Sequence, residues 1–299
     1  MHDQRSTLGR FIIPGVLRRG SERRPRVRQL WAADLVALEE CLGQAPLDNV
    51  YLRSELRHGA LRQGALYGVE RPREPSAIVA AAMVGPLVVP WAPAPRDLAA
   101  LAEALRPRAH LIQLLVGPRD QIASLQLLLQ RQLRPPRLVR SDQPHYAITN
   151  AELVDAQESA PMRRATLDDF DQVLSAGAAM HLEEVGFDPM RSDPDGYRQR
   201  VQTLIRRGWI HIWVEDGRLA FKAECAAVTA EAIQLQGVWT RPDLRRRGLG
   251  TRGMATLCGQ LLAETQAVTL FVNDFNGSAI RVYERVGFTR IGTMRSVLF

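Results

Sequence analysis

The residues best suited to chemistry stand at 245–251 and read Arg-Arg-Arg-Gly-Leu-Gly-Thr. An alternating apolar stretch before them predicts a strand, and an apolar pattern after them, to about residue 263, predicts a helix. Gly248 and Gly250 lack a Cβ, so the backbone there can approach a ligand and direct free N–H groups outward at the positive end of the helix dipole. Such a helix start binds phosphate, and the segment therefore predicts a pyrophosphate cradle.

The spacing of the glycines in this segment distinguishes it from the ATP-binding Walker A loop. That loop requires Gly-x-x-x-x-Gly-Lys-Ser/Thr, which does not occur here. From Arg245 to Gly250 the sequence instead has Arg-x-x-Gly-x-Gly, which resembles the acyl-CoA signature of the GNAT superfamily of N-acetyltransferases.

A second motif follows at the separation that this family has. An apolar run of strand length precedes a turn and a further predicted helix. Asn276, Ala279, Tyr283, Gly287 and Phe288 match the Asn-x-x-Ala-x-x-x-Tyr-x-x-x-Gly-Phe motif that GNAT proteins carry after their fifth strand. On these two motifs, residues 162–299 resemble a GNAT domain, with acetyl-CoA as the implied co-substrate.

The resemblance implies roles for particular residues. A main-chain N–H near Val238 would polarise the thioester carbonyl, and Asn276 would help to hold the pantetheine arm. Tyr283 suits the general acid for the departing thiolate, because a tyrosine with a pKa near 10 stays protonated at neutral pH. The implied cofactor-binding residues are Val238, Trp239, Thr240, Arg245, Arg246, Arg247, Gly248, Leu249, Gly250, Thr251 and Asn276.

The acceptor site and the general base are less defined by the sequence. In GNAT folds the segment joining the first two helices borders the acceptor, and here it is acidic, which favours a primary amine. Glu224 shares one face of a predicted strand with Lys222, and it can be a catalytic base, an acceptor anchor or only the partner of Lys222. The expected substrate-binding residues are Glu183, Glu184, Asp188, Lys222 and Gln236.

Composition restricts the alternatives. With 299 residues the chain has room for two domains, and its net charge of +7 comes almost wholly from arginine. No basic stretch is interleaved with aromatic residues, so a nucleic-acid partner is not expected. Three widely separated cysteines favour neither a disulfide framework nor a zinc site, and we expect no metal. The apolar run at 11–17 is too short to cross a membrane, and we expect a cytoplasmic protein without a membrane partner.

A weak internal repeat predicts the domain organisation. Residues 27–35 resemble residues 162–170, and the predicted elements of the first half follow the order of the second. Where the phosphate turn should be, however, residues 90–95 contain three prolines and no glycine. We expect a basic flexible tail at 1–26, a degenerate GNAT-like domain at 27–150, a linker at 151–161 and a catalytic domain at 162–299. The expected fold class is α/β with a mixed sheet.

The resulting hypothesis is an N-acetyltransferase that moves an acetyl group from acetyl-CoA to a primary amine by direct attack on the thioester. The amine would belong to a protein lysine or to a small molecule. Two alternatives stay open: a non-catalytic acyl-CoA-binding regulator, and a mycothiol-synthase-like small-molecule acetyltransferase, which shares the tandem architecture. The oligomeric state is left open.

Overall fold

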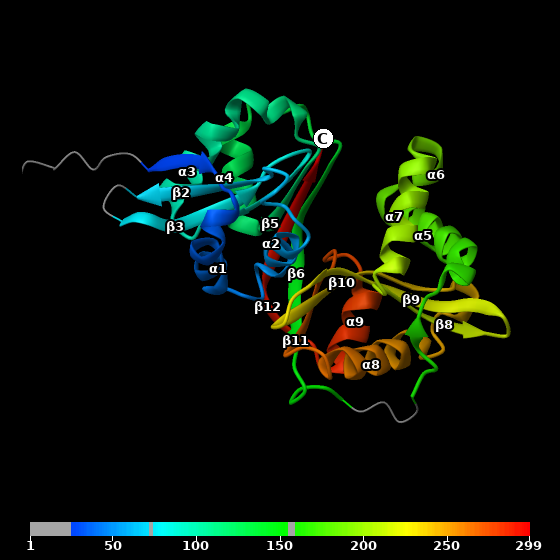
Figure 1. The fold of residues 1–299 in the computed structure, drawn as a ribbon. Coiled ribbons are helices and arrows are strands. Elements are labelled where there is room, and N and C mark those ends of the chain that lie inside the picture. Colours follow the sequence, from blue (N-terminus) through cyan, green and yellow to red (C-terminus); the bar gives the residue numbers. More distant parts are fainter. Residues whose placement is uncertain (1–24, 72–73, 155–158) are drawn as a thin grey trace, which may run out of the picture.

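The computed structural model describes residues 25–71, 74–154 and 159–299 (Figure 1). Almost all of the predicted tail at 1–26, and part of the predicted linker at 151–161, lie outside these residues. No helix in the described ranges is long and apolar enough to cross a membrane. The first half contains β1 (Arg26–Gln29), α1 (Leu35–Gly43), α2 (Val50–Arg57), β2 (Leu66–Arg71), β3 (Glu74–Met83), β4 (Leu87–Trp91), α3 (Pro95–Leu105), β5 (Leu114–Pro118), α4 (Arg119–Leu129) and β6 (Leu138–Ile148).

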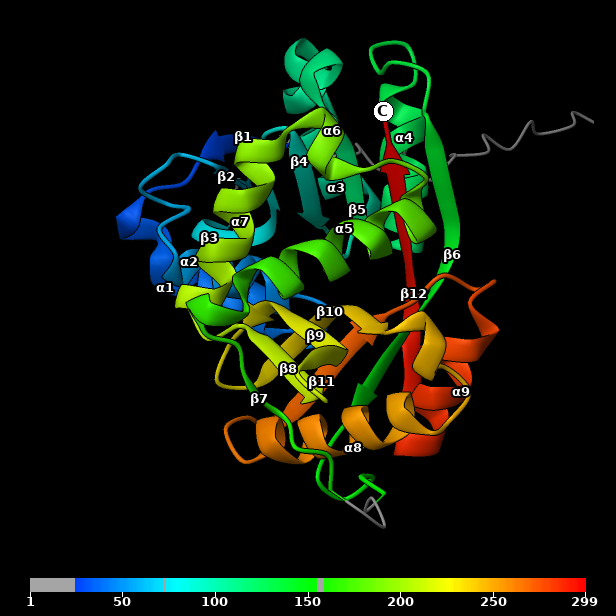
Figure 2. The ribbon, with the colours of Figure 1, turned by 90° about the vertical axis from the view of Figure 1, so that its right-hand side faces the viewer.

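The second half repeats this alternation of strands and helices. It contains β7 (Arg163–Arg164), α5 (Phe170–Val185), α6 (Pro189–Ser192), α7 (Pro194–Arg206), β8 (Ile210–Glu215), β9 (Arg218–Val228), β10 (Ala232–Thr240), α8 (Leu249–Leu262), β11 (Ala267–Phe271), α9 (Gly277–Val286) and β12 (Thr289–Leu298). Helices α5 and α7 cover one face of the second half's strands, and α8 and α9 cover the other (Figures 1 and 2). The mixed α/β fold class is therefore confirmed.

The strands of the described residues join one sheet of twelve, in the order β1-β2-β3-β4-β5-β12-β6-β11-β10-β9-β8-β7. Neighbours are antiparallel except for β4 with β5 and β10 with β11, which are parallel and are connected through helices α3 and α8. Each half thus contains one parallel crossover unit at a corresponding place. The two units face each other across the centre of the sheet.

The centre of the sheet is built by an exchange of strands between the halves. The carboxy-terminal strand β12 pairs with β5 of the first half, while β6 of the first half pairs with β11 of the second. Strands β6 and β12 also pair with each other, from Leu138 opposite Leu298 to Ala147 opposite Thr289. Both strands run between the two halves (Figure 1). Each half therefore depends on a strand from the other.

The internal repeat has a structural counterpart in a pair of matching ion pairs. Arg28 on β1 pairs with Asp34 at 2.6 Å, and Arg163 on β7 pairs with Asp169 at 2.7 Å. Both pairs join an edge strand to the carboxylate six residues later, at the start of the first helix of each half. The repeated sequence thus fixes the same strand-to-helix corner at the two opposite edges of the sheet.

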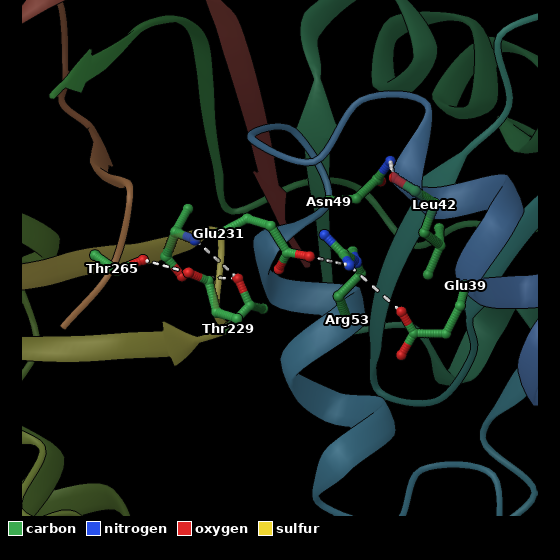
Figure 3. Close-up of polar contacts among 9 residues, drawn as sticks. Glu39, Leu42, Asn49, Arg53, Thr229, Glu231 and Thr265 are labelled. Carbon is green, nitrogen blue, oxygen red and sulfur yellow. Dashed lines mark hydrogen bonds and ion pairs between the residues drawn. The ribbon is translucent and has the colours of Figure 1, made fainter.

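A further contact between the halves lies at the start of β10 (Figure 3). The guanidinium of Arg53 on α2 lies 2.7 Å from the carboxylate of Glu231 and 3.4 Å from that of Glu39. One residue further along α2, the hydroxyl of Ser54 accepts a hydrogen bond of 3.1 Å from the main-chain N–H of Val228. Apolar side chains close the same contact, namely Val50, Ala227, Ala232 and Ala267. Helix α2 therefore holds the turn from which β10 starts.

Candidate active site

Strands β10 and β11 diverge beside the predicted phosphate cradle. Their parallel pairing extends only from Ala232 opposite Ala267 to Gln234 opposite Thr269, although β10 continues to Thr240. Over the same stretch β10 shifts register against β9 between residues 236 and 239, where Gly237 has a positive φ of 59°. The bulge and the divergence leave main-chain groups near Val238 without strand partners. These groups are available to a ligand.

The cradle itself has the geometry that its glycines predict. Arg246 and Gly248 both have positive φ, 63° and 82°, and α8 starts at the next residue, Leu249. Among the described residues, no acceptor takes a hydrogen bond from the main-chain N–H groups of residues 246–251. A Cβ at Gly248 would meet nothing within 4 Å, so the approach to these groups is open. Free N–H groups at a helix start form an anion site.

The three arginines of the cradle differ in what they contact. Arg245 donates from Nε to the Thr240 carbonyl at 3.0 Å, and its guanidinium lies 2.8 Å from the carboxylate of Glu183. Its charge is thus already partnered, and it ties the cradle to β10 and to α5. Arg246 and Arg247 are exposed and form no ion pair within the described part of the chain. They can meet a phosphate without losing an existing partner.

Several predicted cofactor residues point their side chains elsewhere. Trp239 and Leu249 are buried in the hydrophobic core, so only their main chains can reach a ligand. Thr251 is half-buried in the first turn of α8. The side-chain oxygen of Asn276 caps α9 by accepting from the Ala279 N–H at 3.2 Å, and its amide nitrogen donates to no described residue. That nitrogen is the part of Asn276 left for a ligand.

Tyr283 lies on α9 with most of its side chain buried. The residue is 6% exposed, and its ring meets that of Phe288 edge-on, with 5.8 Å between centroids. Its hydroxyl forms no hydrogen bond to any residue that the structure describes. Burial, reinforced by the carboxylate of Glu184, raises the pKa of Tyr283 above its ordinary value. The phenol is therefore protonated and has a proton to give.

Glu224 lies against the bulge of β10 within a buried charge network. Lys222 Nζ lies 2.7 Å from one carboxylate oxygen and also donates to the carbonyl of Gly237 at 3.1 Å. On the other oxygen, Arg200 lies at 3.3 Å, and Gln236 donates at 3.4 Å. Burial alone would raise its pKa, but the two cations hold the pKa of Glu224 at about 2. Of the three roles that the sequence left open for Glu224, this environment favours the partner of Lys222.

The predicted acidic rim does not act as one group. Glu183 is paired with Arg245, and Asp188 caps α6 by accepting from the Met190 N–H at 2.9 Å. The carboxylate of Glu184 has no ion-pair partner among the described residues, although Arg140 donates to its main-chain carbonyl at 3.0 Å. The residue is exposed as a whole, while desolvation of its carboxyl group by neighbouring protein raises the pKa of Glu184. Of the three rim carboxylates, Glu184 is the one whose carboxylate has no side-chain partner among the described residues.

Comparison with known protein families identifies the domain that contains this candidate site. Residues 178–288 match the model of the acetyltransferase (GNAT) family, and residues 64–173 match a domain of unknown function, DUF4081. The second half carries a GNAT acetyltransferase domain. The resemblance inferred from the two motifs is thereby confirmed, and the GNAT domain makes the chain an acyltransferase.

Solved structures extend the GNAT fold over nearly the whole chain. A GCN5-related N-acetyltransferase from Sphaerobacter thermophilus is 20% identical, with a TM-score of 0.60, over 91% of this chain and 95% of that one. A GNAT-family acetyltransferase from Colwellia psychrerythraea is 14% identical, with a TM-score of 0.57, over 92% and 99%. A Drosophila protein is 14% identical, with a TM-score of 0.60, over 91% and 98%. No curated protein matches the sequence.

One glycine of the GNAT helix was missed by the motif reasoning. Gly253 follows Gly248 and Gly250 so that the three also satisfy Gly-x-Gly-x-x-Gly, the spacing of dinucleotide-binding turns. A Cβ on Gly253 would lie 3.0 Å from the ring of Phe221 on β9. This third glycine therefore lets α8 pack closely on the sheet, and the family match assigns the turn to the GNAT domain.

Three polar residues beside the site were also missed. Arg200 contacts Glu224 from α7, and the ring of His181 on α5 lies edge-on to that of Tyr197, with 5.7 Å between centroids. Burial lowers the pKa of His181, which keeps its ring neutral at neutral pH. Arg140 comes from β6, in the other half of the chain. Its sequence position carries no sign of this placement, because the strand exchange creates it.

Proposed function

We propose that the protein transfers an acetyl group from acetyl-CoA to a primary amine by direct attack on the thioester. The observation that carries this proposal is the row of free main-chain N–H groups at residues 246–251, beside the point where β10 leaves β11. The row would hold the pyrophosphate, with the exposed guanidinium groups of Arg246 and Arg247 adding charge. The divergence of the strands would admit the pantetheine arm and the acetyl group.

The chain's own groups would share the chemical step. Acetyl-CoA supplies an activated acyl carbon. The main-chain N–H of Val238 polarises the thioester carbonyl, an interaction worth on the order of 3 kcal/mol in the transition state. As the amine nitrogen bonds to the acyl carbon, the carbon–sulfur bond breaks, and Tyr283 gives its hydroxyl proton to the departing thiolate. The raised pKa of Tyr283 keeps the phenol protonated until the thiolate forms.

The remaining proton is the one that the amine must lose. Glu184 is the better acceptor for it, because its carboxylate forms no ion pair within the described residues and desolvation by neighbouring groups raises its pKa. Glu224 is a weak base, because Lys222 and Arg200 stabilise its ionised form. We assign to Glu224 the task of fixing the bulge through Lys222, whose ammonium also holds the carbonyl of Gly237.

We further propose that the first half does not bind CoA. Helix α3, at the place corresponding to α8, begins with Pro95, which has no N–H to offer. Asp97 in the same turn is fully buried and pairs with Arg71 at 2.7 Å, so a carboxylate already occupies the helix start. Beside β4, the N–H of Ala92 is taken by the side chain of Gln121 at 2.8 Å. These protein groups remove or occupy the main-chain donors at the counterpart place, while a cavity lined by Ala92, Pro95 and Gln121 remains beside them.

A binding and turnover experiment tests the function. Gly250→Asp adds bulk 3.5 Å from Thr240 and a negative charge at the cradle, so acetyl-CoA binding measured by calorimetry should fall below detection. Ala263→Asp adds the same charge to the exposed end of α8 and should bind as wild type does. Wild-type affinity in Gly250→Asp would contradict the cradle. Binding without transfer to any amine of a broad panel would instead support a regulator.

A further inference from the structure

The charges around the acceptor end of the site identify a substrate class. We propose that the acceptor carries a carboxylate as well as its amine, and that Arg140 of β6 binds this carboxylate; free amino acids are the compounds of this class. The inference rests on the acetyl transfer proposed above. It differs from the acidic-rim expectation, in which only a cationic group of the acceptor is recognised.

Arg140 is a guanidinium with unused binding capacity. It lies on β6 opposite Ser296 of β12, is half-buried, and donates to the main-chain carbonyl of Glu184 at 3.0 Å. A guanidinium offers five N–H donors in a planar fork, and this is the one hydrogen bond that Arg140 makes within the described residues. It forms no ion pair there either, which is unusual for a partly desolvated cation. A carboxylate is the ligand that matches this fork.

The position of Arg140 places such a ligand beside the reaction. Arg140 contacts Glu184, and the carboxylate of Glu184 acts electrostatically on both Lys222 and Tyr283, the proposed acid. From the other side, Arg140 is also within electrostatic range of His181. A carboxylate on Arg140 would therefore leave the amine of a small acceptor near Glu184, which the proposed function assigns as its base.

The charge balance of this region favours the same conclusion. Three cations act electrostatically on His181, namely Arg140, Arg200 and Lys222. The carboxylates beside these cations are Glu184, which forms no ion pair within the described residues, and Glu224, which belongs to the buried charge network. Lys222 and Arg200 both pair with Glu224, and Glu183 is paired with Arg245. Arg140 is therefore the one of the three cations that forms no ion pair within the described residues. A zwitterionic acceptor supplies the missing carboxylate, while a protein lysine would bring another cation and no anion.

Matched pairs of substrates test the proposal. Amino acids and their decarboxylated amines, for example phenylalanine with phenethylamine and lysine with cadaverine, are compared as acetyl acceptors. We expect the amino acid of a pair to have the higher kcat/KM. In Arg140→Leu this advantage should fall by about 10- to 100-fold, with the decarboxylated amine unaffected, because a charge-assisted bidentate interaction is lost. Arg140→Lys should restore part of the advantage, since it keeps the charge but not the fork.

Two further measurements make each outcome decisive. Arg137→Leu removes an exposed arginine three residues away and should leave the preference intact, and thermal unfolding shows whether each variant is folded.

Binding of N-acetylphenylalanine and of its carboxamide, in the presence of CoA, is measured by calorimetry. Equal or better use of decarboxylated amines, or an unchanged preference in Arg140→Leu, overturns the inference while acetyl transfer stands. A third outcome is that no acetyl transfer occurs, while the ligands bind in a carboxylate-dependent way that Arg140→Leu abolishes. This outcome overturns the proposed transfer and supports the carboxylate site. If neither transfer nor carboxylate-dependent binding is observed, both proposals are overturned.

Discussion

The buried pair of Lys222 and Glu224 allows a prediction whose size follows from the structure. Lys222→Met keeps the length of the side chain and removes its charge. Glu224, 4% exposed, would then face only Arg200 at 3.3 Å. Removing one partner of a buried pair costs about 3–5 kcal/mol where the other charge is left uncompensated. Because Arg200 still offsets part of that cost, the free energy of unfolding at pH 7 should fall by an amount toward the lower end of this range.

The pKa of Glu224 gives a related quantity, the stability that its ionised form contributes when both cations are present. Folding lowers it from the ordinary glutamate value of 4.5 to about 2. A pKa that folding depresses stabilises the protein above the unfolded value, and this stability is lost as the pH falls from about 4.5 to 2. The shift corresponds to about 3 kcal/mol, at the lower end of the estimate from the broken pair. Both estimates assign the stability to the ionised carboxylate.

Urea denaturation at several pH values measures both effects. The difference in unfolding free energy between wild type and Lys222→Met should be largest near pH 7 and shrink as the pH approaches 4, where Glu224 of the variant becomes protonated. The double variant Lys222→Met with Glu224→Gln should recover part of the loss, because no unpaired charge remains. Asp243→Asn breaks an exposed pair with Arg241 and serves as the control, with no measurable change expected. A loss below about 1 kcal/mol in Lys222→Met would refute the reasoning.

Three other predictions concern catalysis and folding. Tyr283→Phe should lower turnover about 10²- to 10⁴-fold and leave acetyl-CoA affinity unchanged, as measured by steady-state kinetics and calorimetry; turnover at the wild-type rate would exclude Tyr283 as the acid. Glu184→Gln should remove the acidic limb of the pH–rate profile, because transfer falls as the pH drops through the raised pKa of Glu184 and its base form is lost; an unchanged limb assigns the base elsewhere. The fragment 159–299, which lacks β6, should show no cooperative unfolding by circular dichroism, and a stable fragment would mean that the exchanged strand is dispensable.

Local spacing in the sequence predicted the backbone conformation at the proposed cofactor side of the site. The glycines at 248 and 250 and the motif from Asn276 to Phe288 lie within single strand–helix units, and each sets its own backbone conformation. The same is true of the repeated corner formed by Arg28 with Asp34 and by Arg163 with Asp169. Features of this kind depend on neighbours a few residues away, so a sequence pattern can reveal them.

The acceptor side could not be found in the same way. Its environment depends on pairings between distant residues, such as β6 with β11 and β12, which leave no periodic signal. The contrast between Glu184 and Glu224 is also tertiary, since Glu224 was the sequence candidate for the base until Lys222 and Arg200 were seen to surround it. The local strand pattern already offered Lys222 as a partner of Glu224, but the burial of both residues and the approach of Arg200 from α7 are tertiary, and they decide the pKa of this carboxylate.

The exchanged strands explain why a first half without its own cradle would persist in this chain. Strand β6 lies between β11 and β12, so removing it would leave β11 without a partner on one side and expose sheet edge at the centre of the fold. The same strand brings Arg140 to Glu184, and α2 holds the turn at which β10 begins through Arg53 and Glu231. The first half thus contributes to the site by position and by charge. On this argument it is part of the proposed catalytic unit, whether or not its own counterpart site binds a ligand.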